Sequence, residues 1–115
     1  MTEANIVTAL SALVANRVYP DIAPLNATLP LITYQQVGGQ AVNYLEAVSS
    51  DKKNARIQVN VWASTRLQAM TLIRQVEDEM VKNPILAYVE GAAIARYDSE
   101  TKQYGAIQDF SVWIS

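Results

Sequence analysis

Few residues in this sequence have the chemical types needed for catalysis or ligand binding, and the first candidates are three consecutive acids, Glu77-Asp78-Glu79. Carboxylates held close together can bind a hard metal ion or act as an acid–base pair. Consecutive residues on a helix point in different directions, so these three cannot share one ion without help from neighbours. We interpret the run as a solvent-exposed helix face on which Arg74 and Asp78, four residues apart, form an ion pair.

Two other short motifs have residues that could meet a phosphate group. Asp51 is followed by Lys52 and Lys53 on a polar stretch, where such lysines usually serve solubility. We keep these three residues as candidate loop contacts to a partner. Gly38-Gly39 lies in a strand-like run and matches neither glycine-rich phosphate-loop pattern, so it predicts a bulge or bend in the backbone.

The chain has no histidine and no cysteine. Histidine is the commonest general base and transition-metal ligand, and structural zinc sites are built from cysteine and histidine. We therefore expect no metal, no cofactor and no enzymatic activity. A site built from carboxylates, lysine or tyrosine stays open as an alternative, but no set of such residues in the sequence forms one.

Composition sets further expectations. The 115 residues predict a single domain, 1–115, large enough to bury a core without disulfides. Nine basic and eleven acidic residues give a net charge of −2, without the basic stripe of a nucleic-acid-binding protein. No apolar run approaches the roughly 20 residues that span a bilayer, and no signal peptide is recognisable. We expect neither a membrane partner nor sequence-specific nucleic-acid binding.

A strand followed directly by a helix must form the centre of the fold. Apolar and polar residues alternate from Ala55 to Ala63, which predicts a strand with one face on the core. Thr65 and Gln68 then have the spacing of a helix capping box. The apolar residues expected in the core are Ile57, Val59, Val61 and Ala63 on the strand, and Ala69, Leu72, Ile73, Val76 and Met80 on the helix.

The remaining elements flank this unit. A first helix is predicted up to Asn16-Arg17, and an irregular connector with three prolines over residues 18–30. Further strands are expected at residues 31–44, 85–97 and 107–114, with mobile loop tips at 49–54 and 99–105. A patch at Gly91-Ala92-Ala93 suggests a bulge. The order helix, strand, strand, helix, strand, strand predicts an α+β fold, with two helices on one face of a four-stranded mixed sheet.

Two helices can cover only one face of such a sheet, so the other face is expected to be exposed. The residues predicted there are Arg56, Gln58, Asn60 and Trp62 on one strand and Asp109, Ser111 and Trp113 on another. Tryptophan and arginine are enriched at the energetic centres of protein interfaces. We predict an oligomer interface formed by Arg56, Gln58, Asn60, Trp62 and Trp113. The alternative is that each tryptophan lies under a loop or helix, because tryptophan is usually buried somewhere.

The sequence resembles the tail-completion, or tail-terminator, proteins of long-tailed phages and prophages. The resemblance covers nearly the whole chain and rests on three segments: Asn16-Arg17-Val18-Tyr19-Pro20-Asp21, Leu29-Pro30-Leu31-Ile32-Thr33-Tyr34-Gln35 and Asn54–Ala63 running into a helix. It implies an α+β subunit that closes into a ring, with six copies expected. That ring would cap the tail tube, end its polymerisation and help to join the tail to the head.

The implied partners are other copies of the chain, the tail tube protein and head–tail connector proteins. The implied location is the virion tail, after assembly in the bacterial cytoplasm. Two alternatives remain open: a head-side connector component of the same neck, and an unrelated α+β domain that binds a small molecule. The second would require a deep polar pocket with convergent carboxylates.

Overall fold

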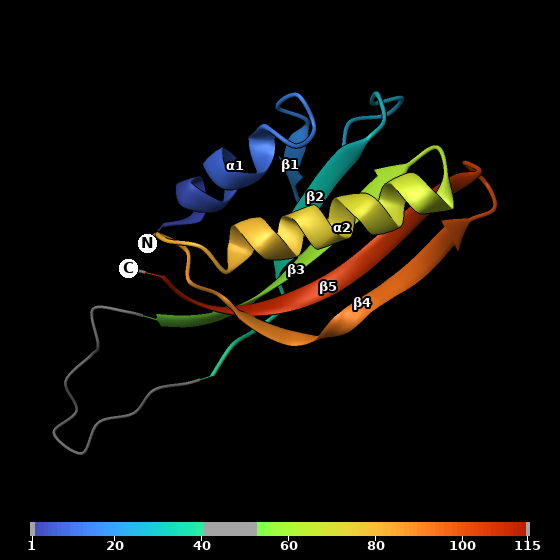
Figure 1. Ribbon diagram of the computed structural model, residues 1–115. Helices are drawn as coiled ribbons and strands as arrows, with labels where there is room; N and C mark the ends of the chain where they lie inside the picture. Colours follow the sequence, from blue (N-terminus) through green and yellow to red (C-terminus); the bar gives the residue numbers. More distant parts are fainter. Residues whose placement is uncertain (1, 41–52, 115) are drawn as a thin grey trace, which may run out of the picture.

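The structure is a computed structural model that describes residues 2–40 and 53–114. Figure 1 shows two helices lying against one twisted sheet. The helices are α1 (Glu3–Ser11) and α2 (Arg66–Met80), and the strands are β1 (Val18–Pro20), β2 (Leu31–Gln36), β3 (Lys53–Ala63), β4 (Tyr88–Asp98) and β5 (Gln103–Ile114).

The sheet has five strands in the order β1-β2-β3-β5-β4. β1 runs parallel to β2, and every other neighbouring pair is antiparallel. The α+β class and the mixed sheet are confirmed, whereas the prediction of four strands is wrong. The fifth strand is Val18–Pro20, at the start of the connector predicted over residues 18–30. Three residues are too few to show a period of two.

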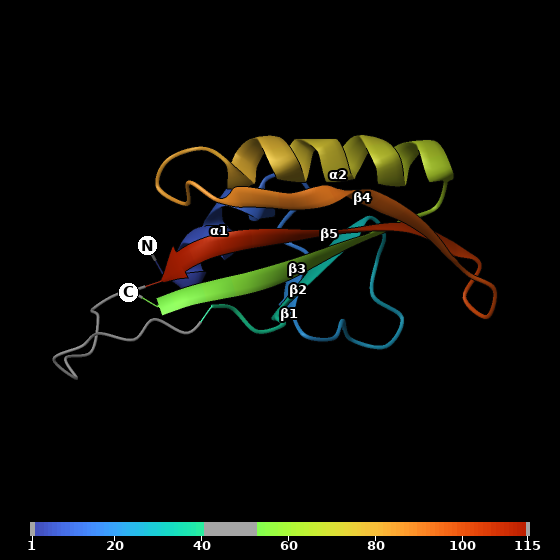
Figure 2. The same ribbon diagram turned by 90° about the horizontal axis from the view of Figure 1, so that it is seen from below.

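Both helices cover the same face of the sheet (Figure 2). The core beneath them combines the apolar faces of β3 and β5 with the apolar stripe of each helix. Its completely buried side chains include Ile6, Leu10, Val59, Val61, Ile73, Val76, Phe110 and Val112. The predicted core faces of β3 and α2 are confirmed, because burial along β3 alternates as the sequence does.

The helix ends follow local chemistry. Gln68 N donates to Thr65 Oγ1 at 3.1 Å, which confirms the predicted cap of α2. The returning bond goes from Ser64 N to Gln68 Oε1 at 3.4 Å, one residue earlier than a capping box places it. α1 ends at Ser11, before the predicted Asn16-Arg17, because Ala15 and Asn16 adopt positive φ angles of 49° and 68° that a right-handed helix does not allow.

The paired glycines have the predicted backbone role. β2 ends at Gln36, and hydrogen bonds from Val37 N to Arg56 O and from Arg56 N to Gly38 O, both 2.8 Å, continue the contact with β3. Gly39, with a φ of 153°, lies against the Asn54 backbone, where a Cβ would clash. The close approach therefore requires glycine at this position.

The loop prediction over residues 49–54 needs a correction at its end. Lys53 begins β3 and pairs with Ile114, so it is an exposed strand residue and not a loop tip. Asp51 and Lys52 lie outside the described residues. The bulge predicted at Gly91-Ala92-Ala93 is confirmed, because the β4–β5 register shifts between Glu90 and Ile94.

Candidate interaction surface

The face of the sheet that carries no helix is the surface predicted to bind a partner, and we call it the open face. The β3–β5 register places Arg56, Gln58, Asn60 and Trp62 beside Ser111, Asp109, Ile107 and Gly105, respectively. Trp113 lies further along the same face, beside Asn54. All five residues predicted for the interface are therefore on one side of the molecule, and their role in an interface stays a prediction.

The polar centre of the open face is organised by contacts within the chain. Arg56 Nε donates to Asp109 Oδ2 at 2.8 Å. Hydrogen bonding to Asp109 raises the pKa of the Arg56 guanidinium. Asn54 Nδ2 donates to Ser111 Oγ at 2.9 Å on the neighbouring ladder position. These contacts join β3 to β5 and hold the four side chains in place.

Trp62 is half-buried and not fully exposed. Its ring lies over Gly105 on the paired strand, where a Cβ would come within 2.8 Å of ring carbons. Trp62 also lines a cavity of about 620 Å³ with the loop over residues 21–27 and the Asp98–Gln103 turn. The alternative that a loop covers this tryptophan is thus correct in part. The sequence signal for the position of the ring was Gly105, because a glycine leaves room for a large side chain on the neighbouring strand.

Trp113 occupies a different part of the open face. It is 40% exposed near the end of β5. Its ladder partner is Asn54, whereas Trp62 is eight residues further along β3, a separation of roughly 26 Å along the strand. The two tryptophans therefore belong to separate contact points and cannot form one cluster.

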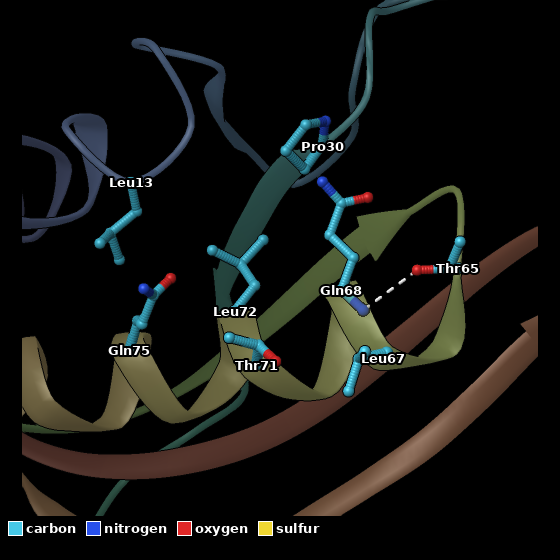
Figure 3. Close-up of a pocket in the computed structure, with 8 residues that line it drawn as sticks. All are labelled: Leu13, Pro30, Thr65, Leu67, Gln68, Thr71, Leu72 and Gln75. Carbon is cyan, nitrogen blue, oxygen red and sulfur yellow. Dashed lines mark hydrogen bonds between the residues drawn. The ribbon is translucent and has the colours of Figure 1, made fainter.

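An open hollow of about 460 Å³ lies on the helix side of the molecule (Figure 3). Leu13, Pro30, Leu67 and Leu72 give it an apolar lining, and Thr65, Gln68, Thr71 and Gln75 make up the rest. None of the eight lining residues is charged. The hollow therefore lacks the convergent carboxylates that the small-molecule alternative requires.

The acidic run on α2 has structural contacts in place of a metal site. Glu77 Oε1 accepts a bond of 2.9 Å from Gln108 Nε2, and Glu79 Oε1 lies 3.1 Å from Lys82 Nζ. The Arg74–Asp78 ion pair is wrong, since neither residue takes part in an ion pair in the described structure. Over residues 2–40 and 53–114, no group of three or more potential ligands is arranged to hold a metal ion. No helix in these same ranges has both the length and the apolar character to cross a membrane.

These features define a small α+β protein with an uncovered sheet face that carries two separate tryptophans. The chain belongs to the tail completion protein gp17 family, whose model matches residues 6–115. The resemblance noted in the sequence is thereby confirmed at the level of the family. No curated protein matches the chain.

Two solved structures share the fold. A chain of a native gene transfer agent virion has a TM-score of 0.62 at 16% identity, with 96% of this chain and 92% of that chain covered. The gp17 protein of bacteriophage SPP1 has a TM-score of 0.55 at 18% identity, with 97% of this chain and 84% of that chain covered. Both are similar to this chain in fold.

Proposed function

We propose that this chain is a non-enzymatic structural subunit that closes into a ring, with six copies expected, at the end of a phage-type tail tube. The ring ends tube polymerisation and offers its other side to the head. Membership of the tail completion family supports a role in finishing a tail. The fold shared with a chain of a gene transfer agent virion supports a place within a particle.

The open face is the observation that carries this proposal. A head-to-tail contact between identical copies can close a ring and leaves two unlike sides, one for the tube and one for the head. Such a contact needs a surface with preset geometry, and the Arg56–Asp109 pair supplies it at the centre of the open face. Trp62 at one end of the face is the main anchor, and Trp113 at the other end is the secondary one.

A head-side connector role is the second candidate, since a neck component would share the same neighbours. Purified tail tubes separate the two roles: a terminator binds their ends, and a head-side component does not. The expected partners are therefore the tube protein first and connector proteins second. In this scheme the chain assembles in the bacterial cytoplasm and ends in the virion tail.

The test uses purified tail tubes and the Trp62→Ala variant. We expect wild-type protein to bind tube ends and stop elongation, and Trp62→Ala to fold but bind at least about tenfold more weakly, because hot-spot truncations cost about 2 kcal/mol or more. Asn60→Arg provides a second variant that places a long charged side chain on the same face. Electron microscopy of tube ends and tube length gives the readout.

The matched control is Thr71→Arg, which makes the same kind of change on the exposed side of α2. This control should cap tubes as the wild type does. Normal capping by both Trp62→Ala and Asn60→Arg would remove the open face as the working surface. If Trp62→Ala unfolds while Asn60→Arg caps normally, Trp62 has a role in the fold alone.

A further inference from the structure

The outer edge of the sheet at β4 is open along its whole length. β4 is the last strand in the sheet and pairs on one side only, with β5. Nine of its eleven residues are exposed. Its eight ladder pairs run from Tyr88–Ser111 to Asp98–Gln103, so this edge spans roughly 27 Å. Free backbone groups along an edge form a template for another strand.

The side chains of β4 add exposed apolar surface to this edge. Tyr88 is 71% exposed and Ile94 64% exposed, and Val89 and Tyr97 are exposed as well. The strand contains neither lysine nor proline, the residues that commonly protect edges. Its protective features are the bulge between Glu90 and Ile94 and the charged residues Glu90, Arg96 and Asp98. An exposed apolar edge of this kind implies a partner strand.

The edge also carries an acid and a base, Glu90 and Arg96. Glu90 lies opposite Asp109, whose carboxylate already holds Arg56. Like charges opposite each other on neighbouring strands are unfavourable. Neither Glu90 nor Arg96 takes part in an ion pair in the parts of the chain that the structure describes. An acid and a base on one edge, both without such a partner, can be satisfied by a copy of the same edge.

The ladder with β5 gives the register of that pairing. Glu90, Ile94 and Arg96 lie opposite Asp109, Ile107 and Gly105, so Glu90 and Arg96 are two ladder positions on either side of Ile94. Val89 and Tyr97 lie opposite Phe110 and Tyr104, three positions on either side. Tyr88 and Asp98 lie four positions away. Counted in β5 positions, these residues are spaced symmetrically about Ile94, although the bulge places three residues between Glu90 and Ile94 and only one between Ile94 and Arg96.

We propose that a second copy of this chain pairs with β4 through its own β4, antiparallel and about a two-fold axis at Ile94. Glu90 then lies opposite Arg96 of the second copy, Val89 opposite Tyr97, and Tyr88 opposite Asp98. Every one of these pairs is complementary in charge, apolarity or hydrogen bonding. Two five-stranded sheets become one sheet of ten strands.

This contact goes beyond the proposed ring. A two-fold contact uses the same patch on both copies and closes at two, whereas a ring needs two different patches. The dimer is therefore the form of the free protein, in which the adhesive edges are covered until the chain reaches a tail. The ring contact uses the open face, and the dimer contact uses the edge.

Cysteine cross-linking gives a direct test, because the chain has no cysteine of its own. Antiparallel partners lie about 4.5–5.5 Å apart between Cα atoms, within the range that a disulfide spans. Ile94→Cys, opposite itself in the dimer, should form an intermolecular disulfide at least about tenfold faster than Tyr88→Cys or Glu100→Cys. Equal rates for the three variants would overturn the register.

Reversal of charge tests the pairing without a cross-link. Light scattering over a concentration series should show wild-type protein passing from monomer to dimer. Glu90→Arg or Arg96→Glu should raise the dissociation constant about tenfold, because each change puts two like-charged pairs into one dimer. The double variant Glu90→Arg/Arg96→Glu should restore the dimer, and Glu100→Arg on the adjacent turn should leave it unchanged.

A protein that remains monomeric at every concentration, or a double variant that does not recover, would overturn the two-fold pairing. The tube-end assay reports on the ring separately. Monomeric protein that caps tubes contradicts the dimer alone, and dimeric protein that never binds tubes contradicts the ring alone.

Discussion

The two edges of the sheet differ in how much of the chain covers them. β1 is three residues long, its Val18 side chain is buried in the core, and Pro20 has no N–H to offer a further strand. Ile22 N also donates to Pro20 O at 2.7 Å, which turns the chain away from the edge. β4 is eleven residues long and almost entirely exposed. One edge ends the sheet, and the other can extend it.

The two edges also differ in the hydrogen bonds that connect them to the helices. α1 packs over the β1 side, and Glu3 on that helix accepts a hydrogen bond of 2.9 Å from the Tyr34 hydroxyl on β2. On the β4 side, Gln108 Nε2 makes the corresponding hydrogen bonds: it donates to the Gly91 carbonyl in the bulge and to Glu77 Oε1 on α2. The β1 side is closed by α1, whereas on the β4 side the two Gln108 hydrogen bonds link the bulge to α2.

The largest expected effect comes from placing the same charge at each edge. Val18→Asp buries an unpaired carboxylate and should lower the free energy of unfolding by about 3 kcal/mol or more. Ile94→Asp should lower it by less than about 1 kcal/mol, because the side chain is already in water. Urea unfolding measures both free energies, at a protein concentration low enough to keep both variants monomeric. Equal losses would mean that β4 is as much a part of the core as β1.

A pH titration tests the hydrogen bond between Tyr34 and Glu3 on the β1 side. Burial, with the hydrogen bond to Glu3 adding to it, raises the pKa of Tyr34 from 10.0 to about 12. The folded state keeps this proton longer than the unfolded state does, so the stabilisation is complete below pH 10 and is lost as pH rises toward 12. The loss should be at most about 2–3 kcal/mol, because solvent screening weakens the contribution of a partly exposed hydroxyl.

Tyr34→Phe removes the titrating group, so its unfolding free energy should not show this loss between pH 10 and 12. Glu3→Gln keeps a partner for the hydroxyl but removes the negative charge, and should give a smaller loss than the wild type. Identical pH profiles for wild type and Tyr34→Phe would show that this residue does not couple stability to pH.

The smallest effect is expected from Gln108→Leu, which removes both hydrogen bonds of this side chain at the bulge. Both former partners are partly accessible to water, so the free energy of unfolding should fall by only about 1 kcal/mol. Amide exchange should speed up in β4 around Gly91 while β1 and β2 keep their protection. Faster exchange across all five strands would mean that Gln108 supports the whole core.

Much of the fold could be predicted because its signal lies within short segments. The alternation along β3 and the apolar stripe of α2 each identify a core face without knowledge of the partner element. The bulge in β4 and the role of Gly38-Gly39 were likewise visible as local breaks in pattern. The candidate site could be predicted only in part. Alternation along β3 and β5 placed the open-face residues on one side of the sheet, and the alternative that a loop covers a tryptophan holds in part for Trp62. Neither pattern predicted how far apart Trp62 and Trp113 lie.

The sequence by itself determined which residues face the core, because burial demands an apolar residue at each turn or pleat and these repeats are local. Only the tertiary structure decided that Val18–Pro20 becomes a strand, since its hydrogen bonds go to β2 and not to its own neighbours. It also decided that the two tryptophans lie at opposite ends of the open face and that β4 takes the outer position. Strand order depends on contacts between distant segments, which no local repeat records.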